Sequence, residues 1–401
     1  MKSRIAFVLG ILLFGLTLVY IPQERAVVAA GENNSARNRG RRASPATLAL
    51  SEGWRIGAPI KHEKLTLYPI ISDRAVNTDR FITLDEGFKS GKVTVAEAGE
   101  SGGEVNKLMV TNRSGKMLVL IAGEIVKGGK QDRIVGHDCI IASSETPVPI
   151  DVFCIEQGRW EARSAGRSQR RSNRTRNRSG GTPSVGGGSG GRSNSFVAGS
   201  GSAETVSALP DLQAPDASML STPGVIAPPD VREKAQADKD QGKVWDNVRE
   251  TSSANEVVEV TGTLNGVYED RRVARKIKSY EHGLKSKLTA SNVVGLVIAV
   301  NGEIVSADVF ASPELFQAYR SKLIKSYALG AISTKATRAR RAKAVDPLAF
   351  LTRVAGERPA RTEQASYRLV EHQSKQYASF ELEFTADERA VLVHFNRVAR
   401  K

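Results

Sequence analysis

The chain has 401 residues, a formal net charge of +15 and only two cysteines. This length allows one large domain or two ordinary ones, and two cysteines exclude a disulfide-rich scaffold. The net charge alone would suggest a nucleic-acid binder, but most of it lies in two segments with almost no large apolar residues, which hold four arginines within 37–42 and eight within 163–192. We therefore expect no specific nucleic-acid partner.

The N-terminus has the features of a secretory leader. Lys2 and Arg4 precede an uncharged apolar stretch over 5–21, and Val28-Ala29-Ala30 offers the small residues that a signal peptidase reads. We predict a signal peptide over residues 1–30 and a protein that is periplasmic or secreted. An uncleaved membrane anchor is the alternative, because the stretch is near the lower limit for spanning a bilayer.

A disordered basic tail is predicted over residues 31–57, and a β-rich half follows over 58–162. The short alternating apolar runs of this half, separated by Gly- or Asn-containing turns, are typical of strands. Two of the predicted strands near its end, over 133–141 and 148–155, would place Cys139 and Cys154 roughly opposite each other. Outside the cytoplasm such a pair either forms a disulfide or stays as buried thiols, and the sequence leaves both open.

Residues 163–229 consist mainly of Gly, Ser, Arg and Pro, a composition that buries too little apolar surface to order itself. We predict a disordered insertion here. The second half over 230–330 begins with a helix-capping pattern at Asp230 and Glu233. Apolar periodicity then predicts an amphipathic helix over 273–288, a hairpin of strands 293–300 and 304–310 around Asn301-Gly302, and a helix over 313–330 that ends at Gly330.

A basic connector over 331–361 and a C-terminal β-hairpin segment over 362–401 are predicted last. The predicted fold class is therefore α+β. A β-rich N-terminal half and a helix-plus-hairpin C-terminal half form one domain, which the insertion interrupts.

The densest run of candidate site residues is Gly-Glu-Ile-Val-Lys-Gly-Gly-Lys-Gln-Asp-Arg over 123–133. Adjacent glycines allow a tight turn that presents backbone N–H groups, and Lys130 and Arg133 add cationic donors, so the run suits a phosphate or a carboxylate. A tight turn whose charges face solvent is the alternative. The run is not a P-loop, because Gly129 stands where the lysine should be and no Ser or Thr follows Lys130.

A second run, Cys-Ile-Glu-Gln-Gly-Arg-Trp over 154–160, groups hydrogen-bonding side chains with an aromatic ring, as the rim of a ligand pocket does. Alternatively, Trp160 closes the core and Arg159 pairs with a carboxylate. Acid and base chemistry could use two of Glu124, Glu156 and Asp308. The five histidines show no ligand pair at helical or hairpin spacing, so we predict neither a metal site nor a cofactor.

The two runs resemble the motifs of a bacterial family named for its association with ADP-ribosylglycohydrolases and rhodanese-type phosphatases. After the insertion, Gln241-Gly242-Lys243-Val244-Trp245, Asp308-Val309-Phe310 and Lys322-Leu323-Ile324-Lys325-Ser326-Tyr327 resemble the later motifs of the same family. The resemblance covers roughly 58–162 and 236–330, on both sides of the insertion, and implies a single domain. The name implies an association with nucleotide-sugar chemistry but no defined activity.

From the residues and the resemblance we expect an exported binding or regulatory domain for an anionic ligand, such as a phosphorylated sugar or a nucleotide sugar. A hydrolase of glycosidic or phosphoester bonds that uses paired carboxylates and a structural envelope protein without a small-molecule site are the alternatives. The basic arms would contact an anionic envelope polymer or lipid. The predicted ligand-binding residues are Glu124, Lys130, Gln131, Arg133, Glu156, Arg159 and Trp160, with Asp308 and Lys322 from the second half.

Overall fold

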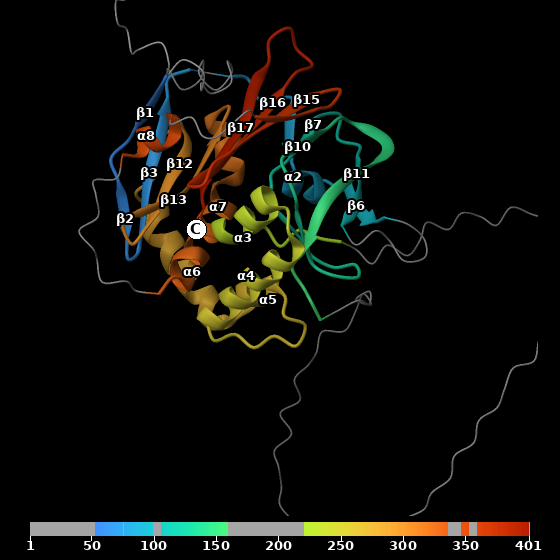
Figure 1. Ribbon diagram of the computed structural model, residues 1–401. Coiled ribbons are helices and arrows are strands. Elements are labelled where there is room, and N and C mark those ends of the chain that lie inside the picture. The colour runs from blue at the N-terminus through green and yellow to red at the C-terminus, as the bar shows by residue number, and fades with distance from the viewer. Residues whose placement is uncertain are drawn as a thin grey trace, which may run out of the picture. The chain divides into compact units, whose positions relative to one another are not determined.

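An antiparallel sheet gathers nine described strands from both halves of the chain (Figure 1). Its halves meet where β3 (Leu65–Ser72) pairs with β12 (Val293–Val300), from Leu65 opposite Val300 to Ile71 opposite Val293. The two halves of the chain therefore share one sheet. The strand order is β1 (Trp54–Ile56), β3, β12, β13 (Glu303–Phe310), β17 (Val391–Ala399), β16 (Tyr377–Phe384), β15 (Tyr367–Gln373) and β14 (Ala360–Glu363), and β2 (Ile60–His62) pairs with β3 off this path.

The computed structural model describes residues 53–74, 76–98, 106–158, 220–335, 346–352 and 359–400, all in the unit Arg41–Lys401. The predicted signal peptide over 1–30 lies outside these ranges, as do most of the predicted tail, Arg159, Trp160 and most of the predicted insertion. Within the described ranges, no helix is both long and apolar enough to cross a membrane. The mixed α+β fold class is confirmed.

Two smaller sheets come from the first half, drawn in blue to green in Figure 1. One has the order β10 (Cys139–Ile141), β7 (Met117–Leu120), β4 (Phe81–Thr83). The other has the order β5 (Val93–Glu97), β6 (Lys107–Asn112), β11 (Ser144–Cys154), β9 (Arg133–Val135), β8 (Ile125–Val126). These sheets position both of the sequence runs that were predicted to form a site.

The predicted placement of the two cysteines opposite each other is wrong. Cys139 pairs with Leu120 across β10 and β7, whereas Cys154 pairs with Arg133 across β11 and β9. The predicted strand over 133–141 is in fact two strands that belong to different sheets. Both cysteines are buried thiols that form no disulfide with each other. Burial raises the pKa of the Cys139 thiol, which makes that thiol a poor nucleophile.

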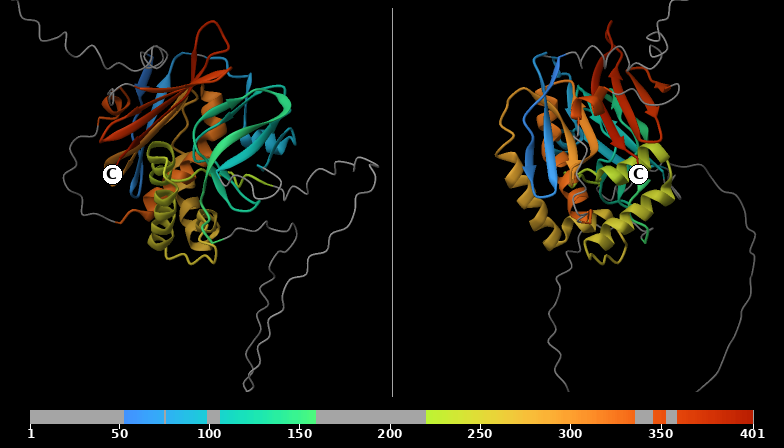
Figure 2. Two further views of the ribbon diagram at one scale, coloured as in Figure 1. Left: turned by 45° about the vertical axis from the view of Figure 1, so that its right-hand side comes forward. Right: turned by 60° about the vertical axis from the view of Figure 1, so that its left-hand side comes forward.

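Helices cover one face of the large sheet (Figure 2). In α6 (Arg271–Lys285) the predicted apolar stripe is buried, and α6 packs on α7 (Pro313–Ser333), which in turn lies on β12 and β13. Because side chains alternate along a strand, Leu296 and Ile298 join the core on the α7 side, whereas Val297 joins a smaller cluster with Leu351 of α8 (Pro347–Thr352). The other helices are α2 (Leu84–Lys89), α3 (Pro229–Glu233), the π-helix η2 (Lys234–Asp238), α4 (Gln241–Ala254) and α5 (Leu264–Glu269).

The predicted hairpin of β12 and β13 is confirmed, with φ of 51° at Asn301 and 85° at Gly302. These positive values are those of the tight hairpin turn that an Asn-Gly pair favours. The helix predicted to end at Gly330 continues to Ser333. A Cβ at Gly330 would make only ordinary contact with Pro229 Cδ, at 3.5 Å, so neither space nor backbone conformation ends the helix there.

Three predicted boundaries are corrected by the structure. Residues 220–229, expected in the insertion, are folded: Lys127 N donates to Ser221 O at 2.8 Å and Ala227 N to Gly123 O at 2.8 Å. Their apolar side chains are buried, and the average composition of the longer segment had masked this local apolar cluster. At the other two boundaries, β1 lies within the range predicted as tail, and the C-terminal strands begin with β14 at Ala360, before the predicted start at residue 362.

Candidate functional site

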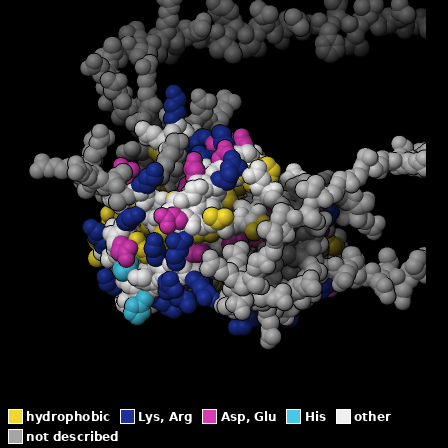
Figure 3. All heavy atoms as spheres, turned by 90° about the horizontal axis from the view of Figure 1, so that it is seen from below, with side chains coloured by type: hydrophobic (Ala, Val, Ile, Leu, Met, Phe, Trp, Pro, Cys, Tyr) yellow, Lys and Arg dark blue, Asp and Glu magenta, His cyan; other side chains and the backbone are white. Residues whose placement is uncertain are grey.

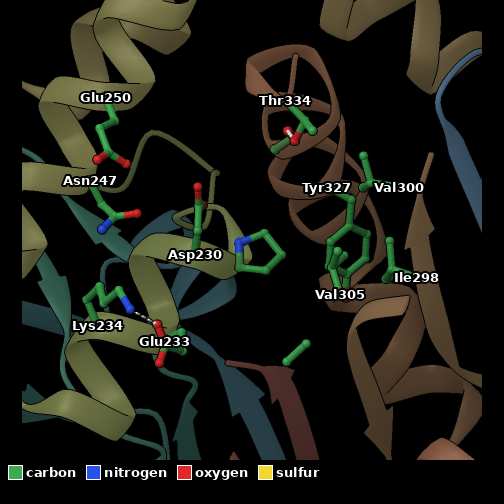
Figure 4. Close-up of a pocket in the computed structure, with 13 residues that line it drawn as sticks. Asp230, Glu233, Lys234, Asn247, Glu250, Ile298, Val300, Val305, Tyr327 and Thr334 are labelled. Carbon is green, nitrogen blue, oxygen red and sulfur yellow. Dashed lines mark hydrogen bonds and ion pairs between the residues drawn. The ribbon is translucent and has the colours of Figure 1, made fainter. Parts of the chain in front are cut away.

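A cavity of about 300 Å³ lies between α3, α4, α7 and the strands β12 and β13 (Figure 4). We call it the α3–α7 groove. One wall is polar and comes from α3, η2 and α4. The facing wall is apolar and comes from β12, β13 and the ring of Tyr327 on α7. The polar wall consists of Asp230, Glu233, Lys234, Asn247 and Glu250, and the apolar wall of Ile298, Val300, Val305 and Tyr327.

The groove continues into a neighbouring hollow that shares Asp230, Glu250 and Thr334 with it. Hydroxyl side chains line this extension, which runs between the C-terminal ends of α4 and α7: Thr251, Ser253, Ser333 and Thr334. The groove therefore changes from an apolar inner part to an outer part of carboxylates and hydroxyls.

Within the polar wall, Glu233 is buried and already paired. Lys234 Nζ contacts it, and Arg400 Nε lies 3.2 Å from its Oε1. Its charge is thus balanced by residues of the protein. Asp230 and Glu250 are more exposed, so the lining retains a net negative charge and its outer carboxylates face the open side.

The polar wall is anchored from beneath by Arg232, which lies on α3 between Asp230 and Glu233. Its guanidinium is completely buried and binds the buried Asp308 of β13, with Nη2–Oδ1 at 2.8 Å and Nη1–Oδ2 at 3.2 Å. The Tyr327 hydroxyl donates to the same carboxylate. Asp308 thus fixes α3 on one side of the groove and the aromatic side chain on the other.

Asp308 also accepts from Asn396 Nδ2 at 3.0 Å and lies 3.2 Å from His394 Nε2. The other ring nitrogen of His394 lies 2.5 Å from Asp138 Oδ2, and Ala122 N donates to Asp138 Oδ1 at 2.8 Å. A buried chain therefore runs from Asp138 through His394 to Asp308 and joins β17 to the first half of the protein.

Two cations balance two carboxylates in this chain. Burial would lower the pKa of His394, but Asp138 and Asp308 outweigh burial and raise that pKa to about 9. Burial would raise the pKa of Asp308, but Arg232 and His394 hold it well below its ordinary value. At pH 7 the imidazolium and the guanidinium thus neutralise both aspartates, as a stable buried ionic network requires.

A second buried cluster joins the halves at Glu124 and Lys322, two of the predicted site residues. Lys322 Nζ contacts Glu124 Oε1 and lies 3.1 Å from Asp85 Oδ2, while Ile121 N donates to Glu124 Oε2 at 3.0 Å. Burial would lower the pKa of Lys322, but Glu124 and Asp85 outweigh burial and raise it. Lys322 is therefore a structural cation, and neither it nor Glu124 lines the groove.

The two predicted runs lie side by side, as far as residue 158. Asp132 N donates to the buried Glu156 carboxylate at 2.9 Å, and Gln131 Nε2 donates to Glu156 O at 2.8 Å. Lys130 and Arg133 meet at the Glu97 carboxylate, which accepts from Lys130 N and Arg133 Nη1. This turn is a separate place from the α3–α7 groove, so the predicted residues form several clusters and not one pocket.

A family model for the ARG and Rhodanese-Phosphatase-superfamily-associated Protein domain, ARPP-1, matches residues 53–185 and 218–397. The chain belongs to the ARPP-1 family. Searches of curated proteins and of solved structures found no match.

In this ARPP-1 domain, the motif residues mainly hold the two halves together. Besides the Glu124–Lys322 and Asp308–Arg232 pairs, Gln241 makes two bonds to the backbone of Cys154, at 2.9 Å from Cys154 N and 2.8 Å from Cys154 O. Gly123 leaves space for Arg232, because a Cβ there would lie 2.6 Å from Arg232 Cγ. The resemblance had therefore identified residues that hold the two halves of the domain together, and not residues that line the groove.

Sequence reasoning missed the groove itself. Asp230 and Glu233 were noticed only as a helix cap, and Tyr327 only as part of a motif. His394 carried no local signal, because its partners Asp138 and Asp308 lie 256 and 86 residues away in the sequence.

Proposed function

We propose that this ARPP-1 domain is a binding domain whose site is the α3–α7 groove. Its ligand is a small molecule with hydroxyl groups along one edge and an apolar ring face, as in a sugar or a nucleoside. The observation that carries the proposal is the division of the groove into a carboxylate wall and a facing apolar wall. The cavity of about 300 Å³ is at the small end of the range that ligand pockets occupy.

The chemistry of the two walls matches such a ligand. Carboxylates are acceptors only, and they form strong hydrogen bonds with hydroxyl donors. The side chains of Ile298, Val300 and Val305 would cover the apolar face of the ring and exclude water from it. Tyr327 stays protonated, because burial and the neighbouring Asp308 raise the pKa of its hydroxyl well above the ordinary value.

The charge of the groove disfavours a phosphate at this place. Three carboxylates, Asp230, Glu233 and Glu250, outnumber the lysines of the lining, which are Lys234 in the cavity and Lys335 in the neighbouring hollow. An anionic group would therefore meet net negative charge. The expected anionic ligand therefore stays a prediction for the turn that carries Lys130 and Arg133. The structure gives less support to the alternative, hydrolysis by Glu124, Glu156 and Asp308, because all three carboxylates are already bound within the protein. Lys322 binds Glu124, Asp132 N binds Glu156, and Arg232 binds Asp308.

The experiment is a calorimetric titration of the full chain with adenosine, ribose and glucose. The phosphate monoesters of these compounds serve as charged comparators. Glu250→Gln should weaken binding of the neutral compounds about tenfold, as the loss of one charge-assisted hydrogen bond would. Asp246→Asn is the matched control, because Asp246 is exposed on the same helix and pairs with Arg249 outside the groove. Equal affinities for all three proteins, or no binding by any probe, would refute the proposal.

We also propose that the protein contacts an anionic envelope polymer or lipid after export. Besides the predicted arms, the observation in favour is a basic face on the described part of the chain, where Lys and Arg side chains gather on the side that α6 occupies (Figure 3). The exposed cations of α6 are Arg271, Arg272, Arg275, Lys276, Lys278 and Lys285.

Co-sedimentation with phosphatidylglycerol vesicles tests the contact, and phosphatidylcholine vesicles are the control. Binding should fall when Arg275 and Lys276 are replaced by Glu, and it should weaken with salt. Fusion of residues 1–30 to a reporter phosphatase that is active only outside the cytoplasm tests export. Failure of the chain to bind anionic vesicles would contradict the proposed contact. An inactive fusion would contradict the proposed export.

A further inference from the structure

We propose that the turn Gly128–Arg133 is an anion-binding site and that the Glu97 carboxylate occupies it as an internal competitor. The external ligand would carry a phosphate group. This site lies apart from the α3–α7 groove, and the proposal does not depend on the function assigned to that groove.

The position of Glu97 shows what the turn can bind. Its Oε1 accepts from Lys130 N at 2.7 Å and from Arg133 Nη1 at 2.9 Å. Gly128 and Gly129 have φ of 112° and 58°, and a Cβ on Gly129 would lie 2.2 Å from the same oxygen. A carboxylate thus lies directly against a glycine backbone, the arrangement with which backbone N–H groups bind anions.

The donors of the turn are fixed independently of Glu97. Asp132 is buried and accepts from Gly128 N at 3.0 Å through Oδ1 and from Thr263 Oγ1 at 2.9 Å through Oδ2. Arg133 is the first residue of β9, which pairs with both β8 and β11. Donors that are held in place before a ligand arrives lose little entropy on binding.

The acceptor is the less constrained partner. The side chain of Arg133 is 1% exposed, whereas that of Glu97 is 19% exposed. Glu97 is the last residue of β5, and β5 is an outer strand of its sheet. The carboxylate can therefore turn outward into solvent while the guanidinium and the backbone donors stay in place.

The higher charge of a phosphate favours the exchange. Lys130 and Arg133 supply the cations of the site, whereas Lys127 is paired with Glu269 at the edge of the turn and does not contribute to it. A phosphate monoester carries up to two negative charges, whereas the Glu97 carboxylate carries one, so the phosphate is attracted more strongly to these cations. Removal of the Glu97 charge should consequently raise phosphate affinity.

The test compares the binding of inorganic phosphate to the wild-type full chain and to Glu97→Gln by calorimetry. The variant should bind at least tenfold more tightly, because the competing charge is gone and the shape is kept. Glu269→Gln is the matched control: it removes one carboxylate beside the same turn, and its contact with Lys127 lies outside the proposed site. The control should keep wild-type affinity, and equal affinities for wild type and Glu97→Gln, or an equal gain in the control, would overturn the proposal.

A second measurement covers the case in which Glu97→Gln folds poorly. Glu97→Ala should lose thermal stability, and acetate should restore it in a saturable way that chloride at the same ionic strength does not reproduce. Failure of acetate to restore stability would show that the turn has no affinity for a free anion and would also overturn the proposal. Binding of neutral sugars or nucleosides in the α3–α7 groove should be unchanged in all three variants, so the two sites are tested separately.

Discussion

The Asp308→Asn variant tests whether buried charge holds the walls of the α3–α7 groove in place. The substitution keeps the shape of the side chain but replaces one oxygen by a donor and removes the negative charge. Arg232 and His394 would then share Asp138 as their one remaining carboxylate in this network. The new amide NH2 group would face a hydrogen-bond donor of a neighbouring side chain and find no acceptor there. Asp308 is completely buried, so solvent does not screen the loss.

Breaking a buried ion pair by removing one partner costs about 3–5 kcal/mol, a large share of the roughly 5–15 kcal/mol that stabilises a typical domain. With an m-value of about 3 kcal/mol/M, the urea midpoint at pH 7 should fall by about 1 M or more. Asp73→Asn is the control, because Asp73 pairs with Arg55 at 2.8 Å on the surface, where such pairs contribute about 1 kcal/mol or less.

Asp308→Asn should also weaken binding in the groove, since it releases both α3 and the Tyr327 hydroxyl. A midpoint shift no larger than that of Asp73→Asn would refute the reasoning. In that case the network would be neither a structural anchor nor a support for the site.

Three further variants test single parts of the frame. His394→Gln should flatten the decline of stability between pH 6.5 and 9: the pKa of His394 is raised to about 9, so its contribution of about 3 kcal/mol is complete below the unfolded value and is lost as the pH rises. Urea midpoints across this range check it, and equal slopes in both proteins would contradict it. Gly123→Ala should lower the melting temperature strongly, because its Cβ would meet Arg232 Cγ at 2.6 Å with φ at 85°; an unchanged melt would show that the turn relaxes freely. Lys322→Met should cost about 3–5 kcal/mol at pH 7, since Glu124 would stay buried without its cation, and Lys322→Met with Glu124→Leu should recover part of that loss in urea unfolding.

Short-range patterns in the sequence correctly predicted several helices and turns. The stripe from Val273 to Leu284 gave α6, and the Asn301-Gly302 turn gave the β12–β13 hairpin, because periodicity and turn chemistry act within a few residues. The motif resemblance went further, since it put Glu124 and Lys322 in one set although 198 residues separate them. Their role in holding the halves together required the contact itself.

The remaining errors have a common cause, which is pairing over long sequence distances. Cys139 and Cys154 were placed on neighbouring strands because they are near in sequence, but their strands pair with β7 and β9 instead. The partners of His394 could not be found by spacing. The groove combines residues of α3, α4, α7 and two strands, and no stretch of the sequence contains enough of it to form a recognisable pattern.

The pairing of β3 with β12 determines when a growing chain can fold. The Glu124–Lys322 pair spans 198 residues and the Asp138–His394 pair spans 256. At about 5–20 residues per second of synthesis, Asp138 waits on the order of 10 to 50 s for its partner. High contact order also slows the search for the native topology. Until the last strands emerge, the nascent first half therefore leaves strand edges and charges exposed that the folded protein pairs.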